Sequence, residues 1–347
     1  MKHPEYQYLD LLKKIMEEGV DKDDRTWVGV RWLFGAQMRF DLSSLKFPLL
    51  TTKKTFLRWI IVELIWLIRG ETNIKYLVDR NVHIWDEWPF QNWLENSGEV
   101  DANKYPKYTD DWYKLKEEFI EKVKNLSQDN EWVITWWDLG PVYGHQWRNF
   151  GWWITDNKWV KDISKRQWWF PGGIQGLKHR WIKLTWVDQL QQSIDKIINK
   201  PTDRRIIVNA WNPLQFPMML LPPRHMFYQF NVDTTNKKLN LQMYQRSADM
   251  FLWVPFNIAS YSTMLLLVSK LTWLQPGEFI HTLGDAHIYK NHFEQVKEQL
   301  SRHPKPWPEL KIKKDIKTLE DIENLEWEDF ELVWYDSHPA IKAPVAV

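Results

Sequence analysis

A rigid turn that enters an aromatic strand restricts the fold of this chain more than any other stretch of its sequence. Residues 220–232 have the sequence LLPPRHMFYQFNV. Neither proline can donate a backbone hydrogen bond, so the Pro222-Pro223 turn belongs to no helix and no central strand. The β-prone residues 226–232 predict a strand directly after it. Arg224 and His225 therefore lie where a stiff turn meets a strand, a position at which catalytic side chains are often held.

The remaining periodicity predicts an α+β fold. Residues 55–69 are apolar nearly all round and predict a buried helix, and residues 257–273 predict a second one. Further helices are expected over 4–18, 110–126, 187–199 and 287–300, and strands over 28–42, 206–211, 239–244 and 279–283. No internal repeat, low-complexity tract or linker divides the chain, so residues 1–347 are expected to form one domain.

Composition excludes several classes of function. The 347 residues carry a formal net charge of +1, which favours neither nucleic acid nor an anionic membrane as a partner. No apolar run approaches the roughly 20 residues that span a bilayer, and the first residues lack the apolar segment of a signal peptide. Cysteine is absent, which excludes disulfides, thiolate metal sites and a thiol nucleophile. A cytoplasmic protein without a metal is expected.

Glycine and tryptophan occur in unusual amounts. The chain has 13 glycines and 25 tryptophans, whereas average usage would give roughly 24 glycines. Several tryptophans and many basic residues fall in residues 152–184, which we interpret as an irregular insertion. Such a segment could stack on nucleic-acid bases, but the near-neutral chain makes this the weaker interpretation.

Twelve polar residues lie beside apolar segments and are candidates for a site. Arginines in excess of what ion pairing needs indicate a doubly charged anion such as a phosphate monoester. Scattered ion pairs and satisfied core groups are the alternative interpretation. Glu63 falls inside an apolar helix, so its pKa should be raised unless it has a polar partner there. The twelve are Arg25, Glu63, Tyr143, Arg204, Arg205, His225, Arg246, Ser247, Asp249, Asn257, His287 and Tyr289.

Ten stretches along nearly the whole chain resemble thymidylate synthase. They occur in the order typical of that family, which makes the resemblance specific. They are residues 24–26 (DRT), 47–54 (FPLLTTKK), 63–66 (ELIW), 84–87 (IWDE), 138–148 (DLGPVYGHQWR), 203–207 (DRRII), 221–223 (LPP), 245–247 (QRS), 254–261 (VPFNIASY) and 281–289 (HTLGDAHIY).

The resemblance implies a fold, a reaction and a dimer. The fold would be a mixed sheet packed by helices, with one sheet face forming a homodimer interface. The reaction would be methylation of dUMP to dTMP, with 5,10-methylenetetrahydrofolate as carbon and hydride donor.

The resemblance also implies roles for individual residues. Arg25, Arg246 and Ser247 would hold the phosphate, with Arg204 and Arg205 reaching the partner subunit's site. His287 and Tyr289 would bind the ribose, and Asn257 the uracil edge, since its amide offers one donor and one acceptor. Glu63 would relay protons, assisted by Tyr143, His225 and Asp249. The folate would contact Trp85, Asp249, Leu252, Trp253 and Phe256.

The chain departs from the family at the residue that starts the reaction. The family has a nucleophilic cysteine between the Pro-Pro pair and the histidine, and this chain has Arg224. A guanidinium stays protonated and cannot attack a pyrimidine ring. We therefore expect catalysis to be lost or strongly impaired. The alternative is a non-catalytic, dUMP-binding homodimer in which Arg224 adds a cation near the nucleotide.

Tryptophan occupies positions at which the family usually has glycine. These are Trp27, Trp137, Trp186, Trp253, Trp273 and Trp334. Where glycine provided positive φ or close backbone approach, a tryptophan should add strain of roughly 1–3 kcal/mol. Trp253 is expected beside the folate, whose space its indole could fill.

Overall fold

The computed structural model describes residues 2–24, 28–127, 130–151 and 186–344. Arg25, Trp27 and the insertion expected at 152–184 lie outside these residues. Within the described part of the chain, no helix is long and apolar enough to cross a membrane.

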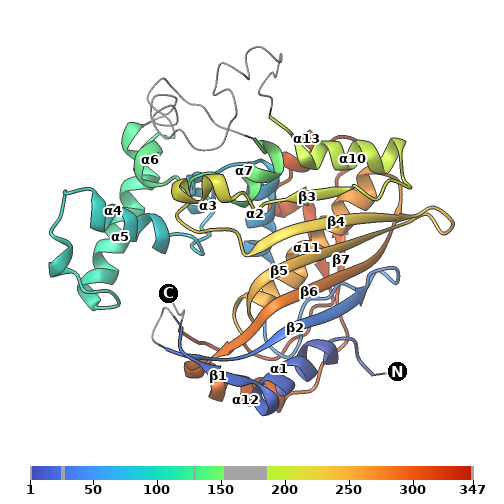
Figure 1. Ribbon diagram of the computed structural model, residues 1–347, viewed down its shortest axis with the longest axis horizontal. Coiled ribbons are helices and arrows are strands. Elements are labelled where there is room, and N and C mark those ends of the chain that lie inside the picture. Colours follow the sequence, from blue (N-terminus) through green and yellow to red (C-terminus); the bar gives the residue numbers. More distant parts are fainter. Residues whose placement is uncertain (1, 25–27, 128–129, 152–185, 345–347) are drawn as a thin grey trace, which may run out of the picture.

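A six-stranded mixed sheet forms the centre of the structure (Figure 1). The strands are β1 (Val20–Lys22), β2 (Val30–Asp41), β3 (Ile207–Asn209), β4 (His225–Asp233), β5 (Lys238–Asp249) and β6 (Gln275–Tyr289), in the order β1-β2-β6-β5-β4-β3. Every neighbouring pair is antiparallel except β5 and β6, which are parallel. The expected α+β class with a mixed sheet is therefore confirmed.

One face of this sheet is buried against helices. Side chains alternate along each strand, so Leu241 and Met243 of β5 and Phe279 of β6 point into the core. Behind them pack α11 (Trp253–Leu271) and α2 (Leu57–Ile68), both apolar on nearly every side. Because long apolar stretches form stable helices only in a core, the sequence pattern located both helices well.

The opposite face of the sheet carries exposed side chains, including Gln37 and Arg39 of β2 and Gln242 of β5. In Figure 1 no labelled helix covers this face. The resemblance predicts that one sheet face forms a dimer contact, and this face is exposed in the single chain.

Shorter elements surround the sheet. The helices are α1 (Tyr6–Glu18), α3 (Lys75–Asp79), α4 (Glu87–Asn96), α5 (Asp110–Asn125), α6 (Glu131–Trp136), α7 (Tyr143–Arg148), α10 (Gln189–Asn199), α12 (Phe293–Leu300) and α13 (Leu319–Glu323). Strands β7 (Glu309–Ile312) and β8 (Phe330–Val333) pair in a small second sheet.

The helix expected over residues 287–300 is wrong at its start. Strand β6 continues through His287 to Tyr289, and α12 begins only at Phe293. The backbone of β6 pairs with β2 and β5 up to this point, which outweighs the local helical pattern. His287 therefore lies on the sheet beside Asp249.

The tryptophans that the resemblance predicts at glycine positions of the family differ in their surroundings. Trp137 is fully buried and stacks on Phe119, with ring centroids 4.4 Å apart. Trp273 and Trp334 instead have φ of 60° and 57° and are 82% and 76% exposed. Left-handed backbone favours glycine, so these two positions retain a glycine-type conformation beneath a tryptophan side chain.

Candidate functional site

The Pro-Pro turn before β4 is held from two sides. The backbone N–H of Arg224 donates to the hydroxyl of Tyr143 at 2.8 Å. From β5, the guanidinium of Arg246 donates to the carbonyls of Pro222 and Pro223 at 3.0 and 2.9 Å, and its backbone N–H donates to the carbonyl of Arg224 at 2.9 Å. The carbonyls of the two prolines lie outside the sheet, and the Arg246 guanidinium supplies their hydrogen-bond donors. Together these bonds fix the position of Arg224.

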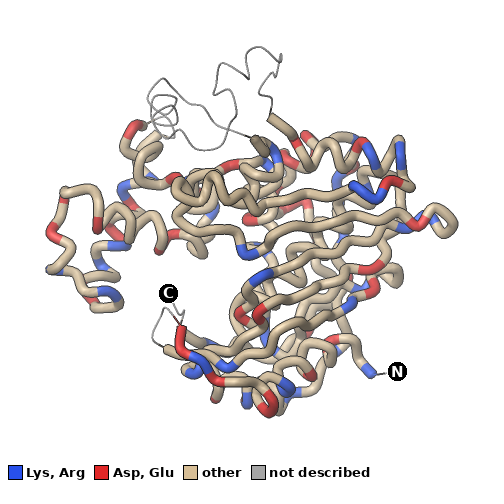
Figure 2. Tube along the Cα trace, in the orientation of Figure 1, with Lys and Arg blue, Asp and Glu red and all other residues tan. Residues whose placement is uncertain are grey.

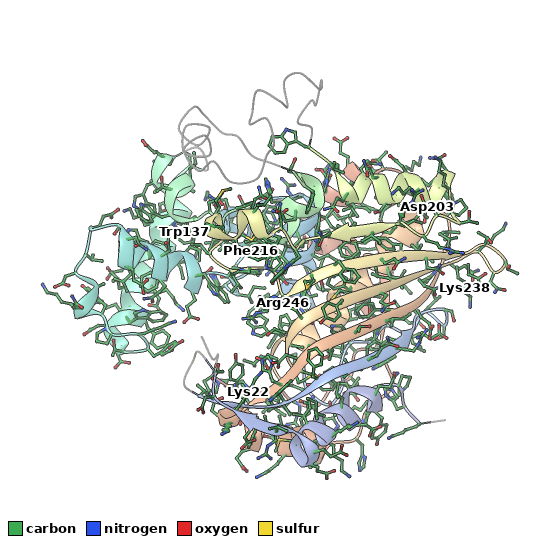
Figure 3. All side chains as sticks on the ribbon, viewed as in Figure 1. Lys22, Trp137, Asp203, Phe216, Lys238 and Arg246 are labelled. Carbon is green, nitrogen blue, oxygen red and sulfur yellow. The ribbon has the colours of Figure 1, made fainter. Side chains whose placement is uncertain are left out.

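Strand direction brings the other polar residues to the same place. Because β5 and β6 are parallel, their carboxyl ends reach one edge of the sheet, which puts Arg246 and Ser247 beside the segment with His287 and Tyr289. Figure 3 shows Arg246 at this end of the sheet, whereas Lys238 lies at the far end of the same strand. Strand β4 is antiparallel to β5, so its first residue, His225, starts at this edge.

The larger of two neighbouring cavities lies at this edge and has a volume of about 590 Å³. Its walls carry the polar groups of Arg224, Arg246, Ser247, His287 and Tyr289. Such a volume lies within the range of roughly 300–1,000 Å³ typical of ligand sites. Cationic and hydroxyl groups converging on one cavity suit a phosphorylated ligand.

The opposite wall of the larger cavity is a face of α4 that sequence reasoning missed. Glu87, Gln91 and Glu95 recur every four residues and all line the cavity, as does Lys107. That spacing was visible in the sequence as a polar stripe. What it faces depends on how α4 docks against the sheet. Figure 2 shows basic residues at the β4 and β5 ends that face this helical region.

The smaller cavity, of about 50 Å³, lies on the other side of Arg224. Glu63, Tyr143, His225 and Asn257 contribute polar atoms to it. Its remaining wall is largely aromatic and aliphatic, formed by Leu67, Ile84, Trp85, Trp88, Leu221, Trp253 and Phe256, together with Gln245. Leu221, Trp88 and Arg224 line both cavities, so Arg224 marks their junction.

Glu63 has the raised pKa that its sequence context predicts. Burial raises the pKa of its carboxyl to about 7, while a hydrogen bond from Trp85 acts in the opposite direction. The Trp85 indole N–H donates to Glu63 Oε1 at 2.7 Å. A carboxyl that titrates near neutrality can hold or release a proton at the cavity wall.

His225 is a neutral imidazole in this setting. Burial lowers the pKa of His225 to about 3, the interaction with the Asn257 side chain acts in the opposite direction, and the positive charge of Arg224 lowers the pKa further. His225 Nδ1 and Asn257 Oδ1 are buried without a hydrogen-bond partner among the described residues. Buried polar atoms in native proteins are nearly always paired, and the interaction between the His225 and Asn257 side chains accounts for part of this pairing.

Other predicted site residues do not line either cavity. Asp249 is buried, and its Oδ1 accepts hydrogen bonds from the backbone N–H groups of Phe251 and Leu252, which shapes the turn before α11. Arg204 and Arg205 are exposed before β3, and Arg205 pairs with Asp203 at 3.1 Å. Figure 3 shows Asp203 at the far end of the molecule from Arg246. The roles predicted for these residues stay predictions.

Metal ligands do not gather in the described part of the chain. None of the described residues form a group of three or more histidine, aspartate, glutamate or cysteine side chains with metal-binding geometry.

Comparisons with known proteins indicate one family. The family model described as thymidylate synthase matches residues 6–347. A thymidylate synthase from Mycoplasma mobile is 46% identical over 344 residues, covering 98% of this chain and 99% of the relative. A match of this extent identifies the chain: it belongs to the thymidylate synthase family.

Proposed function

We propose that dUMP binds in the larger cavity, with the edge of its uracil turned toward the junction with the smaller one. The phosphate would contact Arg246 and Ser247, the ribose would contact His287 and Tyr289, and the uracil edge would reach Asn257. The observation that carries this proposal is a cavity of nucleotide size lined by Arg246 and Ser247, which joins at Arg224 a second cavity lined by Asn257. Uracil offers a donor and an acceptor that would satisfy the Asn257 amide.

Binding would be completed by a second copy of the chain. Thymidylate synthases are homodimers, and the sheet face with Gln37, Arg39 and Gln242 is exposed in the single chain. Arg204 and Arg205 are exposed and contact neither cavity of their own chain. Both observations support a dimer in which these two arginines add to the phosphate contacts of the partner subunit, and Arg25 would join Arg246 and Ser247 at the phosphate of its own subunit. The protein would act in the cytoplasm, as expected for this family.

The reaction implied by family membership, methylation of dUMP to dTMP, would be impaired in this chain. Arg224 occupies the position of the nucleophile, and the sequence contains no cysteine that could replace it. Loss of a covalent nucleophile can lower turnover on the order of 10⁶-fold. Glu63, with a pKa of about 7, would remain able to exchange a proton. Tyr143 and His225 would orient the turn and the ligand, and Asp249 would shape the segment before α11.

The folate donor does not fit the described cavity. Thymidylate synthases use 5,10-methylenetetrahydrofolate, and the sequence predicts contacts from Trp85, Asp249, Leu252, Trp253 and Phe256. Trp85, Trp253 and Phe256 line the smaller cavity, whose volume of about 50 Å³ leaves room for little more than a few water molecules. No chemical step is therefore assigned to the folate.

The second candidate function is nucleotide binding without catalysis. It is favoured by Arg224, whose guanidinium lines both cavities and takes part in none of the ion pairs formed among the described residues. A cation without a carboxylate partner in a cavity is available to an anionic ligand.

Calorimetric titration tests the nucleotide site. The protein should bind dUMP. Deoxyuridine, which lacks the phosphate, is the matched ligand control, and dUMP should bind at least about tenfold more tightly than deoxyuridine. Equal affinity for the two ligands, or no saturable heat with about millimolar dUMP, would refute the proposal. In parallel, dTMP formation from dUMP and methylenetetrahydrofolate should stay at background, and robust turnover would refute the impairment.

A further inference from the structure

The smaller cavity has the walls of an aromatic slot but almost no open space. Rings from Trp85, Trp88, Tyr143, Trp253 and Phe256 line it, and its volume is about 50 Å³. The adjoining larger cavity has about 590 Å³. Ligand sites usually offer roughly 300–1,000 Å³. The slot therefore offers aromatic walls but too little space for a further ring.

Trp85 lines the slot but is also part of the packed core. Its indole N–H donates to Glu63 at 2.7 Å, and its ring packs on Trp66 at 6.0 Å and on Tyr143 at 5.8 Å between centroids. Removing it would leave a buried carboxyl without its donor. It is 8% exposed and belongs to the core.

Trp253 differs in each of these respects. It is the first residue of α11 and is only partly buried. Its ring contact among the described residues is an edge contact with Phe256, with centroids 6.0 Å apart. No hydrogen bond of its indole N–H is formed within the described chain. Its side chain therefore lines the slot without being part of the packed core.

We propose that Trp253 is a specificity-determining residue that closes the aromatic slot. With the indole in place, the site accepts a pyrimidine nucleotide and excludes a second, bicyclic aromatic ligand of the pteridine class. Without it, the slot opens beside Glu63 and Asn257, where such a ring stacks on the remaining aromatic walls. The inference rests on the proposed nucleotide site, because that ligand forms one side of the slot.

Two substitutions remove the indole in different ways. Trp253→Gly clears the whole side chain, and Trp253→Ala retains Cβ and keeps the first turn of α11 less flexible. Trp253→Phe keeps a ring in the slot. Trp334→Gly is the matched control, since its indole is 76% exposed and lines neither cavity.

Calorimetric titration of the full-length protein with folic acid, in the presence and absence of dUMP, tests the closure. The wild type, Trp253→Phe and Trp334→Gly should show no saturable binding up to about 1 mM. Trp253→Gly and Trp253→Ala should bind at least about tenfold more tightly than that limit. Circular dichroism confirms that each variant is folded.

Three results would overturn the proposal. In the first, the wild type binds folic acid as tightly as Trp253→Gly does. In the second, Trp334→Gly gains the same affinity for folic acid. In the third, folded Trp253 variants bind dUMP but gain no affinity for folic acid. A separate dUMP titration distinguishes the two ideas. Absence of dUMP binding in every variant refutes the nucleotide site, whereas a gain in folic acid binding without dUMP still supports the closed slot.

Discussion

Trp273 should be less favourable than glycine at the end of α11. The helix ends at Leu271, and Trp273 follows its C-cap Thr272 with φ of 60°. The N–H of Leu274 donates to the carbonyl of Ser269 at 3.0 Å, as in a Schellman motif, in which the left-handed residue is usually glycine. The indole is 82% exposed, so it contributes little packing that could offset the strain.

Comparing alanine with glycine at this position isolates the backbone effect from the loss of the indole. A left-handed conformation costs a residue with Cβ about 1–2 kcal/mol. The greater freedom of glycine in the unfolded chain offsets about 0.5–1 kcal/mol of this. We expect Trp273→Gly to exceed Trp273→Ala in free energy of unfolding by about 0.5–1 kcal/mol.

Trp186 provides the matched control, because it is 49% exposed and directly precedes the β-bridge between Val187 and Phe150. There the order should reverse, with Trp186→Ala above Trp186→Gly by about 0.5–1 kcal/mol. Trp334, with φ of 57°, should repeat the behaviour of Trp273.

Chemical denaturation at one fixed protein concentration is the appropriate assay. An unfolding entropy of about 2.1 cal/mol/K per residue over 347 residues means that 1 kcal/mol shifts Tm by only about 1–2 °C. A midpoint in urea resolves this difference better. The reasoning is refuted if glycine fails to exceed alanine at position 273, or if the difference has the same sign at positions 273 and 186.

Three further predictions concern the core and the site. Glu63→Gln should remove a pH dependence of the free energy of unfolding. The pKa of Glu63 is about 7 in the folded protein and has an ordinary value of 4.5. Wild-type stability is therefore lost as pH rises from the ordinary pKa through the folded one. The advantage of the glutamine variant should grow between pH 5 and 8 by on the order of 2 kcal/mol, measured by urea unfolding, and a constant difference would contradict the buried carboxyl. Gly140→Ala should cost more than about 3 kcal/mol, because φ is 77° and a Cβ would lie 1.8 Å from the carbonyl oxygen of Met218; a stable variant with unchanged unfolding midpoint would disprove the contact. Arg148→Met should lower the free energy of unfolding by about 2–4 kcal/mol at neutral pH, because it leaves two partly buried carboxylates and a backbone carbonyl without their donor. Thermal unfolding that matches the wild type would show that this ion-pair group contributes nothing to stability.

The sequence was most informative where local pattern and burial agree. The all-round apolar stretch at 55–69 predicted α2, because such a helix can be stable only in a core. The Pro-Pro turn predicted a break before a strand, and β4 begins at His225. Glu63 in its apolar helix predicted a raised pKa, which burial produces. In each case the cause lies within a few residues of the chain.

The tertiary structure decided what depends on contacts between distant segments. Pairing of β6 with its neighbours placed His287 on the sheet rather than in the expected helix, and docking of α4 gave the larger cavity a wall with Glu87 and Glu95. The consequence of each tryptophan was also decided there: Trp137 found a stacking partner, whereas Trp273 found only solvent.

Arg224 shows the division most plainly. The sequence by itself determined that a thiol nucleophile is absent, since this follows from residue type alone. Only the folded chain determined that the guanidinium lies between two cavities, because Tyr143 and Arg246 hold its backbone there from elements about 80 and 22 residues away. Chemistry that resides in one side chain can be read from the sequence, whereas the position of that side chain relative to a ligand depends on long-range packing.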